Sequence, residues 1–293
     1  MTPDQYCTEK AAPRGSTLHY ALLFTPAEPR RAATAVLAFR QEVASVVSEV
    51  SDPGVARTKL EWWREEVGRA FAGNPQHPVT RALAPHLDTR HLASEQFLEV
   101  VDGAELDLDH AEYASHRELG LYCHMVGGIV WMLAAEALGH SERQTLRAAQ
   151  RLGSAMQLAD LIGSVRDDAR RGHIRLPADE MERMSVTRAM LYAPETSVPL
   201  RALLTVELRR AQEQFQQALD LLPDADRERQ RPAVVLAAIY GATLTEMERD
   251  GLRVLERQVS LTPLRMLWIA LSTAWREGRR PAPRRGPATA GRG

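Results

Sequence analysis

The chain has 293 residues and is 44% apolar, enough to bury one large core or two small ones. Its formal net charge is −1, so nucleic acid is not expected as its main partner. Two cysteines, Cys7 and Cys123, form no disulfide framework and indicate a reducing, cytoplasmic compartment. No apolar run reaches about 18 residues, and the N-terminus lacks the order of a signal peptide, so we expect neither a spanning helix nor secretion.

Helical periodicity runs through nearly the whole chain. An early helix ends at Pro13 and Gly15, and a helical turn restarts at Ser16 or Thr17. Further helices are expected at about 30–51, 54–72, 78–87, 91–110, 115–138, 141–171, 199–222, 229–258 and 261–276. Strand patterns are essentially absent, and no Gly/Ser-rich linker divides the chain. The sequence therefore predicts a single all-α domain over residues 1–275, with about ten helices around one core.

Residues 276–293 differ in composition from the rest of the chain. They carry six arginines and one glutamate among prolines and glycines, which predicts a disordered tail. Two roles stay open for this tail: simple solvation, or attraction to the anionic inner face of a membrane.

Two patterns in the middle of the chain each have two interpretations. Asp102, Asp107 and Asp109 lie close together in sequence, but only Asp102 and Asp109 share a helix face, so a charged helix end is favoured over a metal cluster. The Gly127-Gly128 pair lies inside an expected helix, where glycine costs about 1 kcal/mol relative to alanine. Close approach of another helix, or of a ligand, would account for that cost.

The segment from Gln157 to Pro177 carries the densest pattern of polar residues. Asp160, Ser164 and Asp168 are spaced i, i+4, i+8, so they share one helix face. Carboxylates on two facing helices can hold Mg²⁺, which neutralises a diphosphate and helps it leave. On the 30–51 helix the available acids are Glu42 and Glu49, two turns apart.

From about residue 6 to 275 the chain resembles the squalene/phytoene synthase family, and in particular its bacterial presqualene diphosphate synthase-type members. The stretches that carry the resemblance are YCTEKAAPRGSTLHYALLF, VLAFRQEV, SDPGVARTKLEWWREEV, HPVTRAL, VDGAELDLDHAEY, LYCHMVGGIV, GSAMQL, DARRGHIRLP, LPDADR and VSLTPLRMLWIAL. The resemblance implies an all-α isoprenoid synthase fold with a central prenyl diphosphate cavity. It also implies the head-to-head joining of two prenyl diphosphates by Mg²⁺ held on two Asp-rich helices.

The first Asp-rich motif of the family, RxxDDxxD, has lost its carboxylates in this chain. The three aspartate positions are Ala44, Ser45 and Ser48. Gln41 stands at the arginine position, with Arg40 beside it.

The second motif, NxxRDxxxD, is altered in three places. Asp160 replaces the asparagine, Gly163 the arginine and Ser164 the first aspartate, while Asp168 keeps the last. Two further departures lie nearby: Trp131 stands where the family usually has glycine beside the prenyl chain, and Arg175 replaces the tyrosine of RGRxYLP.

The resemblance assigns roles to several residues if the protein is active. The candidate Mg²⁺ ligands are Asp160, Asp167, Asp168, Glu42 and Glu49. The candidate substrate-binding residues are Gln157, Tyr122 and Tyr240, which match cavity-lining positions, and Arg166 and Arg171, which would attract a diphosphate.

Three functions are compatible with this pattern. The favoured one is a degenerate paralogue with little or no Mg²⁺-dependent condensation, which binds a prenyl diphosphate or prenyl lipid or partners an active synthase. The second is an active prenyltransferase that condenses two farnesyl diphosphates. The third is a non-catalytic assembly or scaffold protein. The second needs a substitute for each missing carboxylate, whereas the first and third need none.

Overall fold

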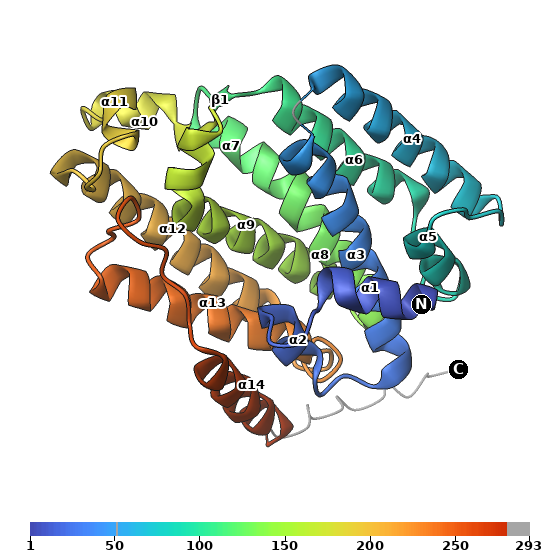
Figure 1. Ribbon diagram of the computed structural model, residues 1–293. Helices are drawn as coiled ribbons and strands as arrows, with labels where there is room; N and C mark the ends of the chain where they lie inside the picture. Colours follow the sequence, from blue (N-terminus) through green and yellow to red (C-terminus); the bar gives the residue numbers. More distant parts are fainter. Residues whose placement is uncertain (51, 280–293) are drawn as a thin grey trace, which may run out of the picture.

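The structure, a computed structural model, describes residues 1–50 and 52–279. Its elements in these ranges are α1 (Pro3–Ala11), α2 (Thr17–Leu22), α3 (Ala27–Glu49), α4 (Pro53–Phe71), α5 (Pro78–Leu83), a 3₁₀ turn (Ala84–His86), α6 (Ser94–Asp109), β1 (Glu112–Tyr113), α7 (His116–Cys123), a π turn (His124–Gly128), α8 (Ile129–Leu138), α9 (Gln144–Arg170), β2 (Ile174–Pro177), α10 (Ala178–Arg183), α11 (Arg188–Leu191), α12 (Val198–Leu221), α13 (Arg231–Arg249) and α14 (Pro263–Gly278). The all-α expectation is confirmed (Figure 1).

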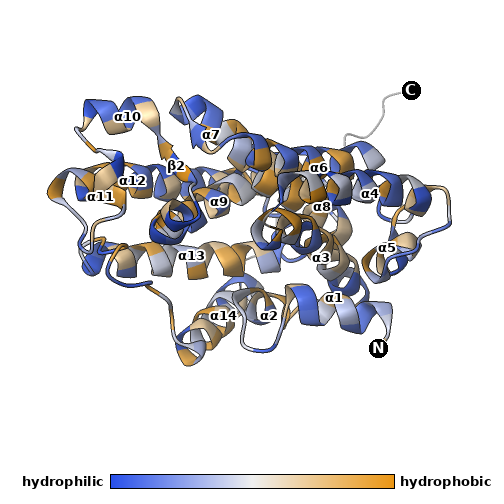
Figure 2. Cartoon of the chain, turned by 45° about the horizontal axis from the view of Figure 1, so that its top comes forward, coloured by the Kyte–Doolittle hydropathy of each residue, from blue (hydrophilic) through white to orange (hydrophobic). Residues whose placement is uncertain are grey.

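Local sequence signals account for most helix ends. The hydroxyl of Ser16 accepts a hydrogen bond from the backbone N–H of His19, which confirms the predicted restart of the chain as α2. Proline lies in the first turn of α4, α5, α12, α13 and α14, where its missing N–H costs nothing. Most of the helices carry both apolar and polar residues (Figure 2).

Several predicted boundaries were wrong. The helix expected over 229–258 ends at Arg249, because Gly251 and Leu252 adopt left-handed backbone with φ of 73° and 53°. The helix expected over 115–138 is confirmed: it runs without a break from His116 to Leu138 and contains a π-helical turn at His124–Gly128. Helix α14 continues to Gly278, beyond the predicted start of the tail at residue 276, and the tail residues 280–293 lie outside the described residues.

The short elements around residues 112 and 174 were not predicted. β1 and β2 form a two-stranded parallel sheet, and the N–H of Ile174 donates to the carbonyl of Ala111 at 2.7 Å. Strands of two and four residues are too short to show an alternating pattern. The sheet nevertheless fixes the position of Arg175 in β2, which bears on the site.

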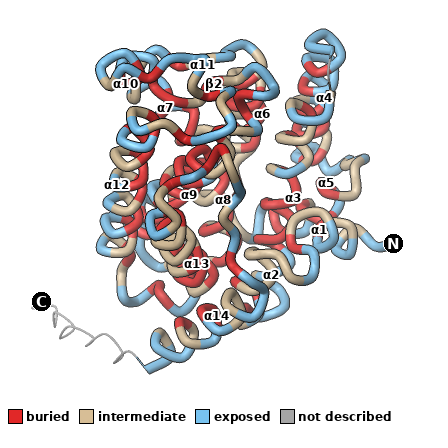
Figure 3. Tube along the Cα trace, turned by 60° about the vertical axis from the view of Figure 1, so that its left-hand side comes forward, coloured by how far each residue is buried: buried red, intermediate tan, exposed pale blue. Residues whose placement is uncertain are grey.

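The core of the described chain consists of two large clusters and a small third one (Ala148, Leu222 and Val234) rather than the single core expected. Of the two large clusters, one joins α9, α12 and α13 with parts of α7 and α14, and the other joins α1, α3, α4, α5, α6 and α8. Leu18 and Trp131 pack against both clusters. Buried residues concentrate on α3 and α9, while α4 and α12 expose their outer sides (Figure 3).

The stretch His116–Leu138 is long and apolar enough to cross a membrane by length and composition. In the fold, 67% of its most apolar window is buried inside the protein, where α8 packs against α3 and α9. This burial is that of a core helix.

Candidate functional site

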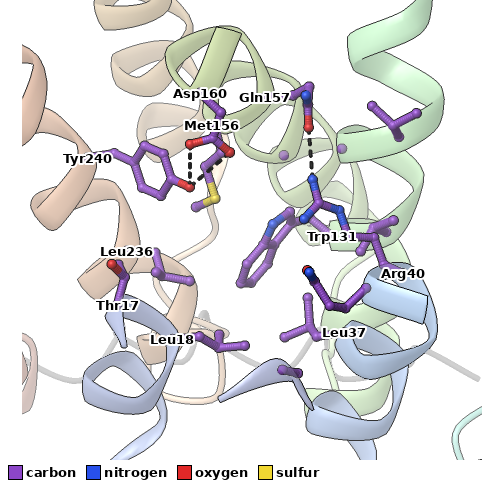
Figure 4. A pocket seen from close by; sticks show the side chains of 16 residues that line it. Thr17, Leu18, Leu37, Arg40, Trp131, Met156, Gln157, Asp160, Leu236 and Tyr240 are labelled. Atoms are coloured by element: carbon purple, nitrogen blue, oxygen red, sulfur yellow. Dashed lines mark hydrogen bonds between the residues drawn. The ribbon is translucent and has the colours of Figure 1, made fainter. Parts of the chain in front are cut away.

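A cavity of about 160 Å³ lies where the two core clusters meet. Its walls come from α3, α8, α9 and α13, which contribute Leu37, Arg40, Trp131, Met156, Gln157, Asp160, Leu236 and Tyr240 (Figure 4). The indole of Trp131 lies between the Arg40 side and the Tyr240 side, so it occupies space in the middle of the cavity.

Two further cavities adjoin this one. A cavity of about 440 Å³ shares Thr17, Asp160 and Tyr240 with it and extends to Met266 of α14. A smaller cavity of about 60 Å³ shares Arg40 and Gln157 and extends to Tyr122 and Asp107, among others. The three cavities form a row from Met266 of α14 to Asp107 of α6, in which neighbouring cavities share lining residues, and we call this row the cavity path.

One wall of the central cavity carries a cation. The Nη2 atom of Arg40 donates to Oε1 of Gln157 at 3.0 Å, and Gln157 is buried. Among the described residues no carboxylate lies within ion-pair distance of this guanidinium. Its positive charge is therefore available to an anion in the cavity. The sequence marked Arg40 only as a neighbour of a missing arginine.

The facing wall carries an acid. The hydroxyl of Tyr240 donates to Oδ1 and Oδ2 of Asp160 at 3.0 and 3.2 Å. Asp160 is surrounded by protein but solvent-exposed, because its open surface faces the cavities. Burial raises the pKa of Asp160 to about 6, against the opposing effects of Arg40 and of the hydrogen bond from Tyr240. Burial, reinforced by Asp160, also raises the pKa of Tyr240.

At the far end of the path, Arg175 bridges two buried carboxylates. Its Nη1 atom lies 2.5 Å from Oδ1 of Asp168, and its Nη2 atom lies 2.9 and 2.8 Å from the two oxygens of Asp107. The second oxygen of Asp168 accepts from the Ser164 hydroxyl at 2.6 Å. The three charged side chains are 7–13% exposed. Arg175 also lies over the ring of Tyr122, 5.8 Å from its centre.

Asp107 is a site residue that sequence reasoning missed. Its neighbours Asp102 and Asp109 form surface ion pairs with Arg64 and Arg57, as a charged helix end should. Asp107 instead continues the buried row of α6 that includes Val100, Gly103 and Ala104. That i, i+3, i+4, i+7 spacing was readable in the sequence and would have placed this carboxylate inside.

The five predicted metal ligands do not come together. Glu42 accepts from the Tyr6 hydroxyl at 2.6 Å and pairs with Lys10 at 3.2 Å, so it ties α1 to α3. Glu49 and Asp167 are exposed. Asp160 bonds Tyr240, and Asp168 bonds Arg175.

Mg²⁺ binds through carboxylates that are free to donate to it. Over the described ranges, no three His, Cys, Asp or Glu side chains form a group that could hold a metal ion. Asp168, the retained motif aspartate, already pairs with the guanidinium of Arg175, and Asp160 accepts from Tyr240. The residues present therefore do not fit the Mg²⁺ site that the family resemblance implied.

The other predicted residues divide into those at the cavities and those away from them. Gln157, Tyr240 and Tyr122 line them, as does Ala44, while Ser164 lines the largest one. Arg166 and Arg171 do not line these three cavities, and neither do the lost motif positions Ser45 and Ser48. Arg166 reaches the carbonyl of Glu256 at 3.5 Å, Arg171 is exposed, Ser45 bonds the carbonyl of Glu42, and Ser48 is exposed.

Comparison with solved structures shows that this all-α fold is the isoprenoid synthase fold. A crystal structure of a dehydrosqualene synthase in complex with ligand superposes with a TM-score of 0.82 at 21% identity, covering 94% of this chain and 96% of that one. The structure of squalene synthase HpnC from Alicyclobacillus acidocaldarius gives a TM-score of 0.74 at 24% identity, over 85% and 94% of the two chains.

The family model for squalene/phytoene synthase matches residues 11–265, and the chain belongs to that family. It is 26% identical to a 15-cis-phytoene synthase from Synechocystis sp. over 92% of this chain and 84% of that protein. It is 28% identical to a phytoene synthase from Mycobacterium tuberculosis over 86% and 84%. The match spans about three fifths of the chloroplastic phytoene synthases from Narcissus pseudonarcissus and Daucus carota, at 59% and 63%.

Proposed function

We propose that this protein keeps the prenyl-binding cavity of its family but carries out little or no Mg²⁺-dependent head-to-head condensation. It binds a prenyl diphosphate or a prenyl lipid, alone or as the partner of an active synthase. The observation that carries this proposal is the Asp107–Arg175–Asp168 bridge, in which a guanidinium of the protein pairs with Asp168, the one aspartate of the two family motifs that keeps its place.

Electrostatics supports the proposal. A diphosphate carries about three negative charges near neutral pH, and departure of such a group needs strong charge stabilisation. Each oxygen of Asp168 already accepts one short hydrogen bond, and both oxygens of Asp107 contact Arg175. A metal could bind there only after displacing a charge-assisted, buried contact.

Binding has its own support. Arg40 presents to the central cavity a guanidinium that has no ion-pair partner among the described residues, and Leu37, Met156 and Leu236 line the same space. A cation beside apolar walls suits a ligand with an anionic head and a hydrocarbon chain. The chemistry points to a prenyl diphosphate.

The same Arg40 favours a second candidate, a working prenyltransferase that condenses two farnesyl diphosphates with a rearranged site. In that case Arg40 would meet the diphosphate, and Asp160, with a pKa raised to about 6 by burial, would serve in proton transfer. Family membership supports this candidate, and the missing carboxylate cluster weighs against it.

The test is diphosphate release from farnesyl diphosphate by the purified full chain, with and without Mg²⁺, beside a calorimetric measurement of farnesyl diphosphate binding. We expect binding without Mg²⁺-dependent release. The variant Arg40→Leu should lose most of the binding of farnesyl diphosphate. It should remain folded, because Arg40 makes no ion pair in the described chain.

A second variant combines Ala44→Asp, Ser48→Asp, Ser164→Asp and Arg175→Tyr. Turnover by this variant alone would mean that metal binding is what the chain has lost. Mg²⁺-dependent turnover by the unaltered protein would refute the proposal in favour of the rearranged enzyme.

A further inference from the structure

Helix α14 exposes a continuous apolar stripe. Leu264, Trp268, Leu271 and Trp275 are 79, 68, 48 and 58% exposed and are spaced i, i+4, i+7, i+11, so they lie on one face. We call these four residues the outer face of α14. The other large exposed apolar residues of the described chain are distributed over many elements: Met1, Leu23, Val55, Trp62, Phe71, Leu121, Tyr192 and Val198. A contiguous stripe with two tryptophans marks an interaction surface.

The opposite side of α14 is firmly attached, so the stripe is not the result of a loose end. Ile269, Ala270 and Thr273 are buried. Glu277 pairs with Arg227 at 2.8 Å, and both side chains are at most 10% exposed. In Figures 1 and 2 the helix lies at the lower edge of the molecule, against α13 and beside α2. The described chain places no element over its outer face.

Positive charge gathers at the C-terminal end of this helix. The guanidinium of Arg279 lies over the ring of Trp275 at 3.7 Å, and Arg276 is exposed beside it. The only acid in α14, Glu277, is the one held by Arg227. The sequence that follows, 280–293, adds four arginines and no acidic residue. The apolar stripe therefore ends in a strongly basic region.

We propose that the outer face of α14 docks on an anionic lipid membrane. Tryptophan and leucine on one face of an attached helix suit the boundary between headgroups and acyl chains, and arginines beside them suit lipid phosphates. A second protein chain fits less well: the helix of 16 residues is about 24 Å long and about 10 Å wide, so its face covers about 240 Å², well below the roughly 800 Å² per partner of a stable interface.

The docking surface adjoins the cavity path. Met266 lines the 440 Å³ cavity together with Val259, Ser260 and Leu261 of the preceding loop. A membrane against the outer face would therefore bring lipid close to this end of the path. This connection to a lipid ligand rests on the proposed function, whereas the docking itself does not.

The experiment is cosedimentation of the full chain with vesicles of phosphatidylcholine containing phosphatidylglycerol, and with phosphatidylcholine alone. We expect binding to the anionic vesicles, weakened by high salt, with a blue shift of tryptophan emission. The double variant Trp268→Ala/Trp275→Ala should bind about tenfold more weakly. The control Tyr192→Ala/Val198→Ala removes two equally exposed apolar residues elsewhere and should bind like the unaltered protein.

Equal binding by both double variants, or no binding by the unaltered chain, would overturn the proposal. Self-association in analytical ultracentrifugation that is lost in the tryptophan variant, without vesicle binding, would instead assign the outer face to a second copy of the chain. If the unaltered chain binds the anionic vesicles but does not bind farnesyl diphosphate, the proposed function is refuted and the docking proposal is unaffected.

Discussion

The guanidinium of Arg175 contacts three carboxylate oxygens on two different elements. Its planar fork grips Asp107 through both oxygens and leaves Nη1 for Asp168, a geometry that a lysine ammonium cannot reproduce. Two negative charges face one positive charge, and the Ser164 hydroxyl adds a further donor to Asp168. Such a triad depends on each member, because removing one leaves a buried charge without a partner.

Replacing Arg175 by methionine should destabilise the protein by about 3–5 kcal/mol, since two buried carboxylates lose their cation. Millimolar Mn²⁺ should then restore part of the loss, because the freed oxygens offer hard ligands. Urea unfolding with and without metal measures both effects. The matched control Arg57→Met breaks a surface pair with Asp109 and should cost about 1 kcal/mol or less, with no response to Mn²⁺. A variant as stable as the unaltered chain would contradict the role given to Arg175.

Asp160 should make stability depend on pH. Burial raises its folded-state pKa to about 6, whereas an unfolded aspartate titrates near about 3.9. The folded state therefore binds the proton more tightly, and the free energy of unfolding falls as pH rises from about 4 to about 6. Unfolding of Asp160→Asn across this range should lack that fall. Tyr240→Phe, which removes a hydrogen bond that lowers the pKa of Asp160, should move the fall to higher pH. Parallel pH profiles for Asp160→Asn and the unaltered protein would rule the effect out.

Among the elements, the π turn at His124–Gly128 sets the distance between two central helices. A Cβ added to Gly127 would lie 2.4 Å from the carbonyl oxygen of Gly153 in α9, and one on Gly153 would lie 2.3 Å from that of Gly127. Close helix packing, the first of the two roles expected for the Gly127-Gly128 pair, therefore accounts for the glycine at position 127. This close contact brings Gln157 and Trp131 to the same cavity.

Gly127→Ala should therefore destabilise the fold by about 3 kcal/mol, at the upper end of the usual cost of overpacking, because backbone atoms must move. Gly120→Ala is the matched control: its Cβ would meet no atom within 4 Å, and replacing a helical glycine should stabilise by about 0.5–1 kcal/mol. Thermal unfolding of both variants gives the comparison. Similar melting temperatures for the two variants would show that the helix of Gly127 and α9 can move apart without a loss of stability.

The sequence predicted the long helices well because their apolar periodicity and capping residues are local signals. It located Gln157, Tyr240 and Asp160 at the cavity through the family resemblance. It could not locate the Arg175 bridge, because Asp107 and Arg175 are 68 residues apart and meet only through the β1–β2 pairing. Glu42 looked available for the same reason: its partners Tyr6 and Lys10 belong to a helix that folds back onto α3.

In the whole molecule, two core clusters meet around a partly polar cavity, and Trp131 packs against both. The indole of Trp131 therefore stabilises the contact between the two clusters and also reduces the cavity volume that is open to a ligand.

Trp131→Ala should lower the free energy of unfolding by about 2–4 kcal/mol, because an indole that packs against both clusters is removed. It should also strengthen binding of farnesyl diphosphate, since the freed volume lies beside Arg40. Calorimetric titration and urea unfolding test the two effects separately. Trp62→Ala, on the partly exposed side of α4, is the control and should leave binding unchanged. Unchanged affinity in Trp131→Ala would mean that the indole does not limit the cavity.

In the proposed function the guanidinium of Arg175 takes the place of a metal ion beside Asp168, so this cation is part of the chain. Every protein molecule carries one such guanidinium from its synthesis onward, whatever the concentration of divalent ions in the cell. A chelator cannot extract it, and no other ion can replace it. The same covalent attachment prevents exchange: a bound metal can leave paired with a phosphate and be renewed, whereas a guanidinium stays with the protein.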